Sequence, residues 1–201
     1  MIVRIENSAA KVINITGYKG ICLVLLDFFV HLGPIKKEET MKQETAIFAC
    51  GCFWGAQYQF EHAKGVIDSV VGYMGGDKEH PTYQEVKAHT TGHAEVTKVV
   101  FDADQTSYVD LCKLFFEIHD PAQTDGQGPD IGPQYRSEIF YLNEEQKKQA
   151  EEVIALLRSK GYEVNTRLTP ASAFWEGEEY HQHYYDKTGG EPYCHIRTKK
   201  F

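Results

Sequence analysis

Short apolar runs alternate with amphipathic stretches over most of the chain, and each pattern predicts one element. Residues 45–50, TAIFAC, form an unbroken apolar run that is typical of a buried strand. After Gly51 the pattern changes to CFWGAQYQFEHA, which favours a helix that ends near Gly65. Residues 66–76 and 94–102 are rich in β-branched side chains and predict two further strands.

Two longer helices have recognisable first turns. Ser107 followed by Asp110 is similar to a capping box, and apolar residues follow it at helical spacing. Asn143 and Gln146 open a second amphipathic stretch, for which Gly161 is a typical stop. Both stretches therefore predict helices that bury one face against a core.

The remaining pattern completes an α+β prediction. Residues 135–142 and 162–169 favour strands, and residues 178–187 favour a short helix. Residues 120–134 form a long loop dense in Gly, Pro and Asp, and loops of that length are often functional. Strands and helices interleave without strict alternation. We therefore predict a two-layer sandwich, with helices packed on a mixed sheet around a ferredoxin-like core.

The first 40 residues differ from the rest of the chain. Their apolar run, ICLVLLDFFV, is too short to span a bilayer and contains Asp27. A signal peptide is the alternative, since Lys11 and Lys19 precede the run, but Asp27 interrupts it and no small-x-small cleavage site follows. We predict an extension at 1–40, weakly ordered and without a catalytic role, and a catalytic domain at 41–201.

Composition and charge narrow the possible partners. The 21 basic and 29 acidic residues give a net charge of −8, so no basic face is expected for phosphates, and a nucleic-acid partner is not predicted. No membrane partner is predicted either. Five cysteines are an odd count for a disulfide scaffold and suit a reducing compartment, so we expect a cytoplasmic protein with one or two reactive thiols.

The stretch GCFWG at 51–55 carries the strongest chemical signal. If a helix begins here, Cys52 lies in its first turn, where free backbone N–H groups and the helix dipole favour a thiolate. We expect this position to lower the thiol pKa from about 8.5. Phe53 and Trp54 follow at once and offer an apolar pocket beside the sulfur. The alternative is that Cys52 is a small buried apolar residue and the two rings are core.

GCFWG resembles the signature of the type A peptide methionine sulfoxide reductases. The resemblance extends from about Thr45 to the C-terminus and leaves out the first 40 residues. It includes six further blocks in the family's order: VGYMGG, PTYQEV, TGHAEV, FFEIHDP, QYRSEIFY and EYHQHYY. It implies a monomeric enzyme without a cofactor that reduces the S epimer of methionine sulfoxide, free or in proteins, and is regenerated by thioredoxin.

The resemblance also implies a role for each catalytic group. Cys52 matches the nucleophile, and Phe53 and Trp54 match the pocket for the substrate's methyl group. Glu95 matches the acid that protonates the sulfoxide oxygen. Burial on a β-branched strand would raise the pKa of this carboxyl and keep it protonated. The alternative is an exposed strand glutamate in a surface ion pair. Cys194, on a Gly-rich tail, matches the resolving cysteine that forms a disulfide with Cys52.

Three further residues match substrate-binding positions of the family. Tyr83 and Tyr135 match tyrosines that donate hydrogen bonds near the sulfoxide oxygen, although tyrosines are also common in cores. Asp130 matches an aspartate that helps to hold the substrate, although it would also suit an ordinary turn. Pro129 and Pro133 depart from the residues common in this loop, which puts the geometry of Asp130 and Tyr135 in question.

Cys50 is a second departure, because the family commonly has Gly there. A disulfide between residues two apart is strained, so we expect Cys50 to be a buried thiol at the strand end.

Three other functions fit parts of the pattern. A zinc site is possible from Cys and His side chains whose spacing matches no familiar finger: Cys50, Cys52, His181, His183, Cys194 and His195. A cysteine hydrolase would pair Cys52 with His62, His93 or His181. A peptide-binding module would use the aromatic pocket and keep its binding without Cys52.

Overall fold

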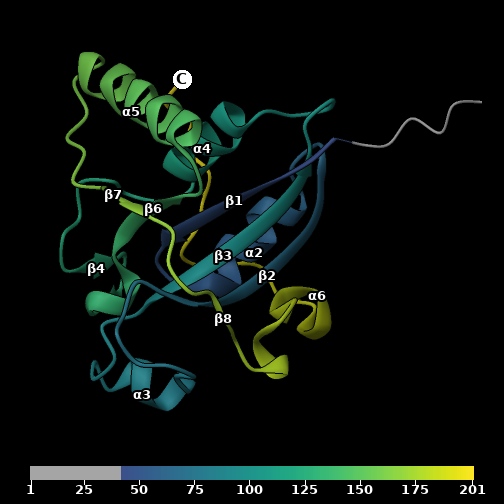
Figure 1. The fold of residues 1–201 in the computed structure, drawn as a ribbon, viewed down its shortest axis with the longest axis vertical. Helices are drawn as coiled ribbons and strands as arrows, with labels where there is room; N and C mark the ends of the chain where they lie inside the picture. The colour runs from purple at the N-terminus through teal and green to yellow at the C-terminus, as the bar shows by residue number, and fades with distance from the viewer. Residues whose placement is uncertain (1–41) are drawn as a thin grey trace, which may run out of the picture. The chain divides into compact units, whose positions relative to one another are not determined.

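The computed structural model describes residues 42–201, and the predicted extension at 1–40 lies outside them. Six strands form one sheet in the order β7-β6-β1-β3-β2-β8 (Figure 1). Neighbouring strands are antiparallel except β6 and β7, which are parallel, so the sheet is mixed as predicted. The strands are β1 (Gln43–Cys50), β2 (Val66–Met74), β3 (Ala94–Asp102), β6 (Ser137–Tyr141), β7 (Arg167–Pro170) and β8 (Trp175–Glu176).

The central part of the sheet has the ferredoxin-like connection. Along the chain it runs β1, α2 (Phe53–Glu61), β2, β3, α4 (Tyr108–Glu117) and β6. In space the four strands lie in the order β6-β1-β3-β2. Each helix therefore connects two strands that have one other strand between them in the sheet. A longer helix, α5 (Glu144–Ser159), packs on α4 and on β6. The predicted two-layer α+β architecture is confirmed.

Strand β1 is buried on both faces, which explains its unbroken apolar run. Phe48 and Cys50 point into the main core, together with residues of α2, α4 and α5. Ile47 and Ala49 point to the opposite face, where Phe174 helps to cover them. Cys50 is therefore a buried thiol at the end of the strand, as expected.

The predicted helix starts are confirmed by their caps. The Ser107 hydroxyl accepts a hydrogen bond from the N–H of Asp110 at 3.1 Å. The Asn143 side chain accepts one from the N–H of Gln146 at 2.9 Å. Each cap satisfies a backbone donor that the helix itself leaves free.

Two predicted elements are shorter than expected. The stretch 162–169 forms a strand only from Arg167, because the N–H of Asn165 bonds to the carbonyl of Pro121 instead of a strand. The stretch 178–187 divides into a 3-10 turn, η2 (Glu179–His181), and a short helix, α6 (Tyr184–Thr188). Between them His183 adopts a left-handed conformation with φ of 51°, which interrupts the helix.

The long loop contains structure of its own. A small hairpin joins β4 (Gly126–Gln127) to β5 (Asp130–Ile131), and a 3-10 turn, η1 (Pro133–Tyr135), follows it. A five-residue helix, α3 (Tyr83–Lys87), begins with a capping box formed by Thr82 and Glu85. These elements and β8 are too short for hydrophobic periodicity to reveal.

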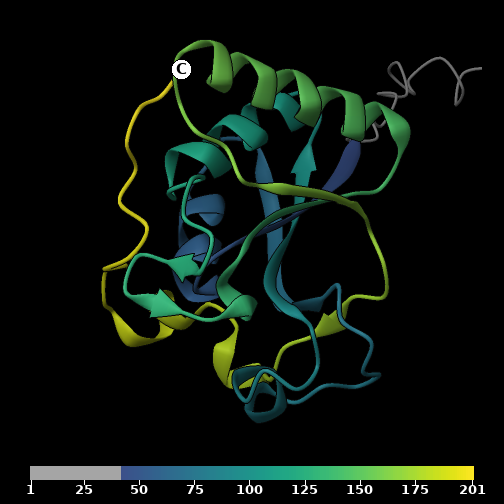
Figure 2. The same ribbon diagram turned by 90° about the vertical axis from the view of Figure 1, so that its left-hand side faces the viewer.

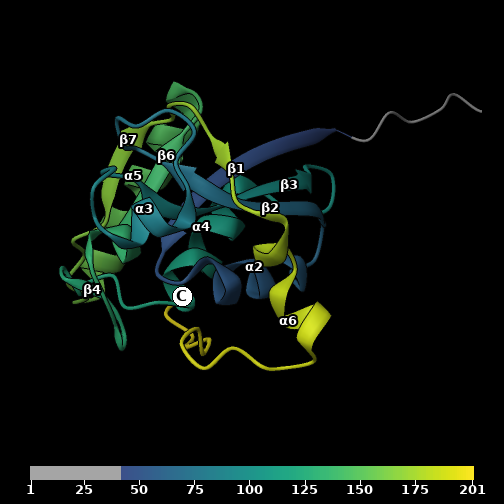
Figure 3. The ribbon, with the colours of Figure 1, turned by 90° about the horizontal axis from the view of Figure 1, so that it is seen from below.

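The C-terminal tail runs past α2 and ends beside the start of the segment that follows α5 (Figures 2 and 3). The Gln59 side chain donates a hydrogen bond to the carbonyl of His195 at 2.8 Å. Further along, the N–H of Thr198 donates to the carbonyl of Glu117 at 2.7 Å, and Arg197 forms an ion pair with the Glu117 carboxylate. The tail is therefore attached to α2 at His195, and to the end of α4 at Arg197 and Thr198. Within residues 42–201, no helix has the length and apolar character needed to cross a bilayer.

Candidate active site

Cys52 lies at the junction of β1 and α2, as the N-cap residue of the helix. Gly51 has φ of 106°, a left-handed region open mainly to glycine, and this lets the chain turn sharply between the strand and the helix. The Cys52 side chain is 8% exposed. Its side chain accepts no capping hydrogen bond, although the N–H groups of Trp54 and Gly55 in the first turn act to lower the pKa of the thiol.

The net pKa of Cys52 differs from the prediction. The hydrogen bond with Cys194 and the burial of the sulfur both raise the pKa above its ordinary value. The N–H groups of Trp54 and Gly55 lower it, so the expected helix-start effect is present but smaller. The expectation of a lowered Cys52 pKa is therefore wrong for this reduced site.

Cys194 lies beside the predicted nucleophile. The sulfurs of Cys52 and Cys194 and a carboxylate oxygen of Asp130 all lie within 4.8 Å of one another. The Tyr193 hydroxyl donates to this carboxylate at 3.4 Å. Thus the tail and the loop that contains Pro129 meet at the Cys52 sulfur, and the prolines do not displace Asp130 from it.

Glu95 is buried on β3, with an exposed fraction of 2%. One of its carboxylate oxygens, Oε2, accepts a hydrogen bond from the N–H of Phe53 at 3.1 Å, which places it next to Cys52. Burial raises the pKa of Glu95 well above its ordinary value, and the nearby Cys52 sulfur acts in the same direction. The carboxyl is therefore protonated more readily than an ordinary glutamate, and the alternative of a surface ion pair is wrong.

Aromatic rings form a wall beside the sulfur. The ring of Phe53 lies 5.0 Å from that of His181, and the ring of Tyr83 lies 4.5 Å from it on another side. Trp54 stacks on Tyr184 with 3.8 Å between the centroids and an angle of 6° between the planes. The two aromatic residues of GCFWG are thus part of one cluster with groups from α3 and from the segment around α6.

His181 is a member of this wall that the sequence did not assign to it. The indole N–H of Trp54 donates to its Nδ1 at 2.9 Å, so the ring proton belongs on Nε2. The side chain is 1% exposed and its Nε2 has no hydrogen-bond partner within the described chain. Burial lowers the pKa of His181, so the ring is neutral. The block EYHQHYY was the available sequence signal, but only the fold brings it to Trp54.

Tyr83 and Tyr135 face the acid from two separate elements. Burial raises the pKa of each phenol, and the charge of Glu95 is the next largest cause for both. Each hydroxyl therefore keeps its proton at physiological pH and is available as a hydrogen-bond donor. Tyr135 follows Pro133 in η1, so this proline too is compatible with the predicted position.

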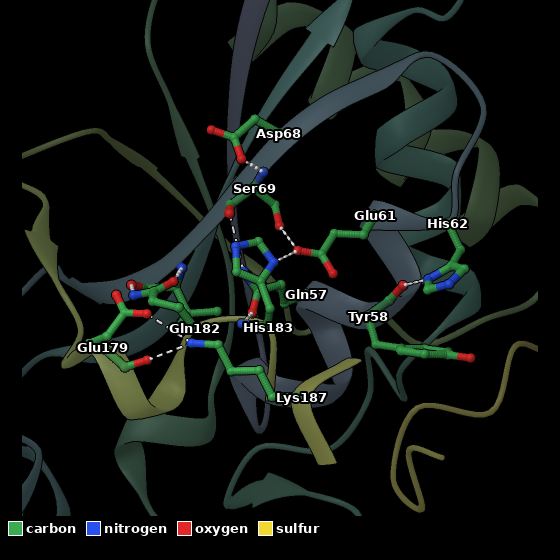
Figure 4. Close-up of polar contacts among 11 residues, drawn as sticks. Gln57, Tyr58, Glu61, His62, Asp68, Ser69, Glu179, Gln182, His183 and Lys187 are labelled. Atoms are coloured by element: carbon green, nitrogen blue, oxygen red, sulfur yellow. Dashed lines mark hydrogen bonds and ion pairs between the residues drawn. The ribbon is translucent and has the colours of Figure 1, made fainter. Parts of the chain in front are cut away.

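A polar network holds the α6 segment against α2 and β2 (Figure 4). The Gln57 side chain accepts a hydrogen bond from the N–H of His183 at 2.7 Å and donates to the carbonyl of Ser69 at 3.1 Å. Glu61 bonds to both His183 and the Ser69 hydroxyl. Gln182 forms two bonds with the backbone of Val71. This network fixes the position of the segment that supplies His181 and Tyr184.

The geometry does not favour the hydrolase alternative. His62 bonds to the carbonyl of Tyr58, and His93 bonds to backbone atoms of its own loop. His181 is bonded to Trp54. Each of the three histidines considered as a base for Cys52 is therefore bonded to another group, and none has a hydrogen bond with Cys52 in the described chain.

The residues of the zinc alternative do not converge. His183 lies with Glu61 and Asp186, whereas Cys52 lies with Asp130 and Cys194. The imidazole of His195 lies between the backbone of Cys50 and the sulfur of Cys194.

Known proteins are similar to this chain in both sequence and fold. The family model for peptide methionine sulfoxide reductase matches residues 44–201. The chain is 46% identical over 155 residues to the peptide methionine sulfoxide reductase MsrA of Geobacter sulfurreducens, with coverage of 76% of this chain and 96% of the relative. Reduced Mxr1 from Saccharomyces cerevisiae has a TM-score of 0.73 and 31% identity, covering 79% and 97% of the two chains. Mxr1 in complex with Trx2 gives 0.53 and 23%, covering 82% and 96%.

Proposed function

The chain belongs to the peptide methionine sulfoxide reductase family and reduces methionine sulfoxide to methionine, and on this premise we propose that Cys52 is its nucleophile. One observation carries the proposal: a single sulfur at a helix start lies with a second thiol, next to a buried carboxyl with a raised pKa and a cluster of aromatic rings. Each step of the reduction needs one of these groups.

The first step transfers the oxygen atom to Cys52. Cys52 loses its proton and its sulfur attacks the sulfoxide sulfur to form an S–S bond, while Glu95 donates its proton to the oxygen, which suits a carboxyl with a raised pKa. The protonated oxygen then passes to the Cys52 sulfur as the S–S bond and the substrate's S–O bond break, methionine leaves, and the proton released by Cys52 restores the Glu95 carboxyl. Cys52 is left as a sulfenic acid, so the substrate sulfur is reduced and the cysteine sulfur is oxidised by two electrons.

The pocket favours one epimer because the sulfoxide has an apolar and a polar side. The methyl group would rest on Phe53 and Trp54, with His181 behind them. The oxygen would then point toward Glu95 and the phenols of Tyr83 and Tyr135. Exchange of the two groups would bury the oxygen against rings, so we propose specificity for the S epimer.

Asp130 lies on the open side of the sulfurs and is partly exposed. It accepts a hydrogen bond from Tyr193, which leaves further acceptor capacity on the carboxylate. We assign it to holding the substrate, either free methionine sulfoxide or the backbone of an oxidised protein.

The second step uses Cys194. Its sulfur is within 4.8 Å of Cys52, so a disulfide between them needs only a small movement of the tail. We propose thioredoxin as the reductant of this bond, and the fold shared with Mxr1 in its complex with Trx2 is consistent with that choice. Such a cycle uses no cofactor and belongs in a reducing compartment such as the cytoplasm.

The nucleophile is tested by a single turnover without reductant. Cys52→Ser should form no methionine from methionine S-sulfoxide, whereas Cys112→Ala, which removes a buried thiol on α4, should form about one equivalent. Mass spectrometry of the wild type after the same treatment should show a link between Cys52 and Cys194. Methionine formation by Cys52→Ser would refute the assignment.

A further inference from the structure

His195 occupies a buried position that the proposed cycle has not yet used. Its side chain is 0% exposed, although Cys194 beside it is partly exposed. The ring rests on the first turn of α2, where a Cβ at Gly55 would overlap its Nδ1. The glycine therefore leaves the space in which this imidazole lies, next to the sulfur of Cys194.

The hydrogen bonds of His195 define its tautomer. Its Nε2 lies 2.9 Å from the carbonyl oxygen of Cys50, and a carbonyl can only accept. Nε2 therefore carries the ring proton, and Nδ1 of the neutral ring has a free lone pair. That Nδ1 lies 2.9 Å from the sulfur of Cys194, so the thiol donates its proton to the imidazole. The arrangement is a thiol paired with an oriented base, as nucleophilic catalysis requires.

We propose that His195 is the base that activates Cys194 for attack on the sulfenic acid of Cys52, an inference that rests on the proposed role of Cys194. The imidazole Nδ1 takes the Cys194 proton, and the thiolate attacks the Cys52 sulfur. The S–S bond forms as the S–OH bond breaks, and the imidazolium returns its proton to the departing hydroxide to give water. Cys194 is oxidised and the sulfenic sulfur of Cys52 is reduced, so no other reactant is needed.

The surroundings suit a base that works near neutral pH. Burial lowers the pKa of His195, but the Cys50 thiol, the Cys50 carbonyl and the Asp130 carboxylate raise it, and the net direction is upward. The other titratable groups near His195 are the imidazole of His119 and the thiol of Cys194, which is the hydrogen-bond partner of His195. Since a free thiol has a pKa of about 8.5, the pair would make Cys194 reactive at a pH where an isolated cysteine is mostly protonated.

The test compares His195→Gln with the wild type by rapid quench after one equivalent of methionine sulfoxide. The glutamine amide can still donate to the Cys50 carbonyl but offers no base to Cys194. Methionine release should be unchanged. Disulfide formation should slow at least tenfold at pH 7, in line with the roughly 10²-fold or larger effect of a general base.

The pH profile separates catalysis from a structural role. The wild-type rate should reach a plateau near pH 7, whereas the His195→Gln rate should continue to rise toward pH 9 as the thiol ionises by itself. His93→Gln, in another buried histidine bonded to backbone atoms, should keep the wild-type profile.

If His195→Gln slows disulfide formation equally at pH 7 and pH 9, or does not slow it at all, the role of His195 as a base is wrong. If the wild type itself forms no Cys52–Cys194 bond, the resolving role of Cys194 is wrong. That result comes from the wild type alone, so it is distinguishable from a failure of the His195 proposal.

Discussion

The N–H of Phe53 donates a hydrogen bond to the Oε2 of Glu95 at 3.1 Å, so the residue that follows the proposed nucleophile also holds the proposed acid. A movement of the first turn of α2 would therefore change the sulfur and the carboxyl together. This bond joins a helix start to the N-terminal end of β3, across 42 residues of sequence. It connects the position of the carboxyl to that of the first turn of α2.

Glu95→Gln should remove the acid without removing this bond, since the amide oxygen can still accept from Phe53. We expect the single-turnover rate of methionine formation to fall about 100-fold, the usual order for loss of a general acid. The KM should change little. Glu44→Gln, at a partly exposed strand glutamate paired with Lys42, is the matched control. A rate close to that of the wild type would exclude Glu95 as the proton donor.

The same variant should change the pH dependence of stability. The folded state holds the Glu95 proton more tightly than the unfolded state, because burial raises the pKa of this carboxyl. Wild-type stability should thus decline as pH rises from about 4.3, the unfolded value, through the higher folded pKa. Glu95→Gln lacks that contribution, so its Tm should exceed the wild-type Tm by more at about pH 8 than at about pH 4.5. Equal differences at both pH values would contradict a raised pKa.

Trp54→Phe should keep an aromatic face against Tyr184 but lose the donor to His181. A buried hydrogen bond contributes about 1 kcal/mol, so we expect kcat/KM to fall by a factor of about 5. Trp175→Phe, at the edge strand β8, serves as the control. Steady-state kinetics with a free and a peptide substrate would measure the effect, and an unchanged kcat/KM would show that the Trp54–His181 bond has no part in the pocket.

Cys194→Ser should separate the two halves of the cycle. The first turnover should still give one equivalent of methionine, since Cys52, Glu95 and the pocket remain. Turnover driven by thioredoxin should be lost, because no disulfide can form. An equal loss of both activities would exclude Cys194 as a dedicated resolving thiol.

Gly55→Ala should impair the docking of the tail. The added methyl group would overlap the His195 ring, which must then move away from the Cys50 carbonyl. We expect disulfide formation to slow and Tm to fall. The free energy of unfolding should decrease by the roughly 1–3 kcal/mol typical of overpacking. Gly190→Ala, in the same tail, meets its nearest neighbour at 3.3 Å and should have a much smaller effect. Equal behaviour of both variants would show that the ring does not need the space above Gly55.

The sequence predicted the elements whose side chains follow a regular period. β1 ends in an unbroken apolar run, β3 is rich in β-branched residues, and α4 and α5 begin at caps that the residue types alone identify. It did not predict α3 or β8, because five and two residues are too few for periodicity.

The candidate site was predicted less evenly. Cys52 stands out by its neighbours along the chain, whereas His181 and His195 acquire their partners from residues 127 and 145 positions away. The net pKa of Cys52 was missed for the same reason, since its largest cause is Cys194, at the far end of the chain. Such relationships depend on how the tail and the α6 segment dock, which no local pattern encodes.

The two attachments of the tail, at Gln59 and at Glu117, affect how the enzyme survives its own chemistry. In the proposed cycle Cys194 is held beside Cys52 in advance, so it would act at a high effective molarity and shorten the lifetime of the sulfenic acid. Peroxide would then have little time to carry Cys52 to the irreversible sulfinic acid. A docked tail would thus protect a repair enzyme from the oxidant whose damage it corrects.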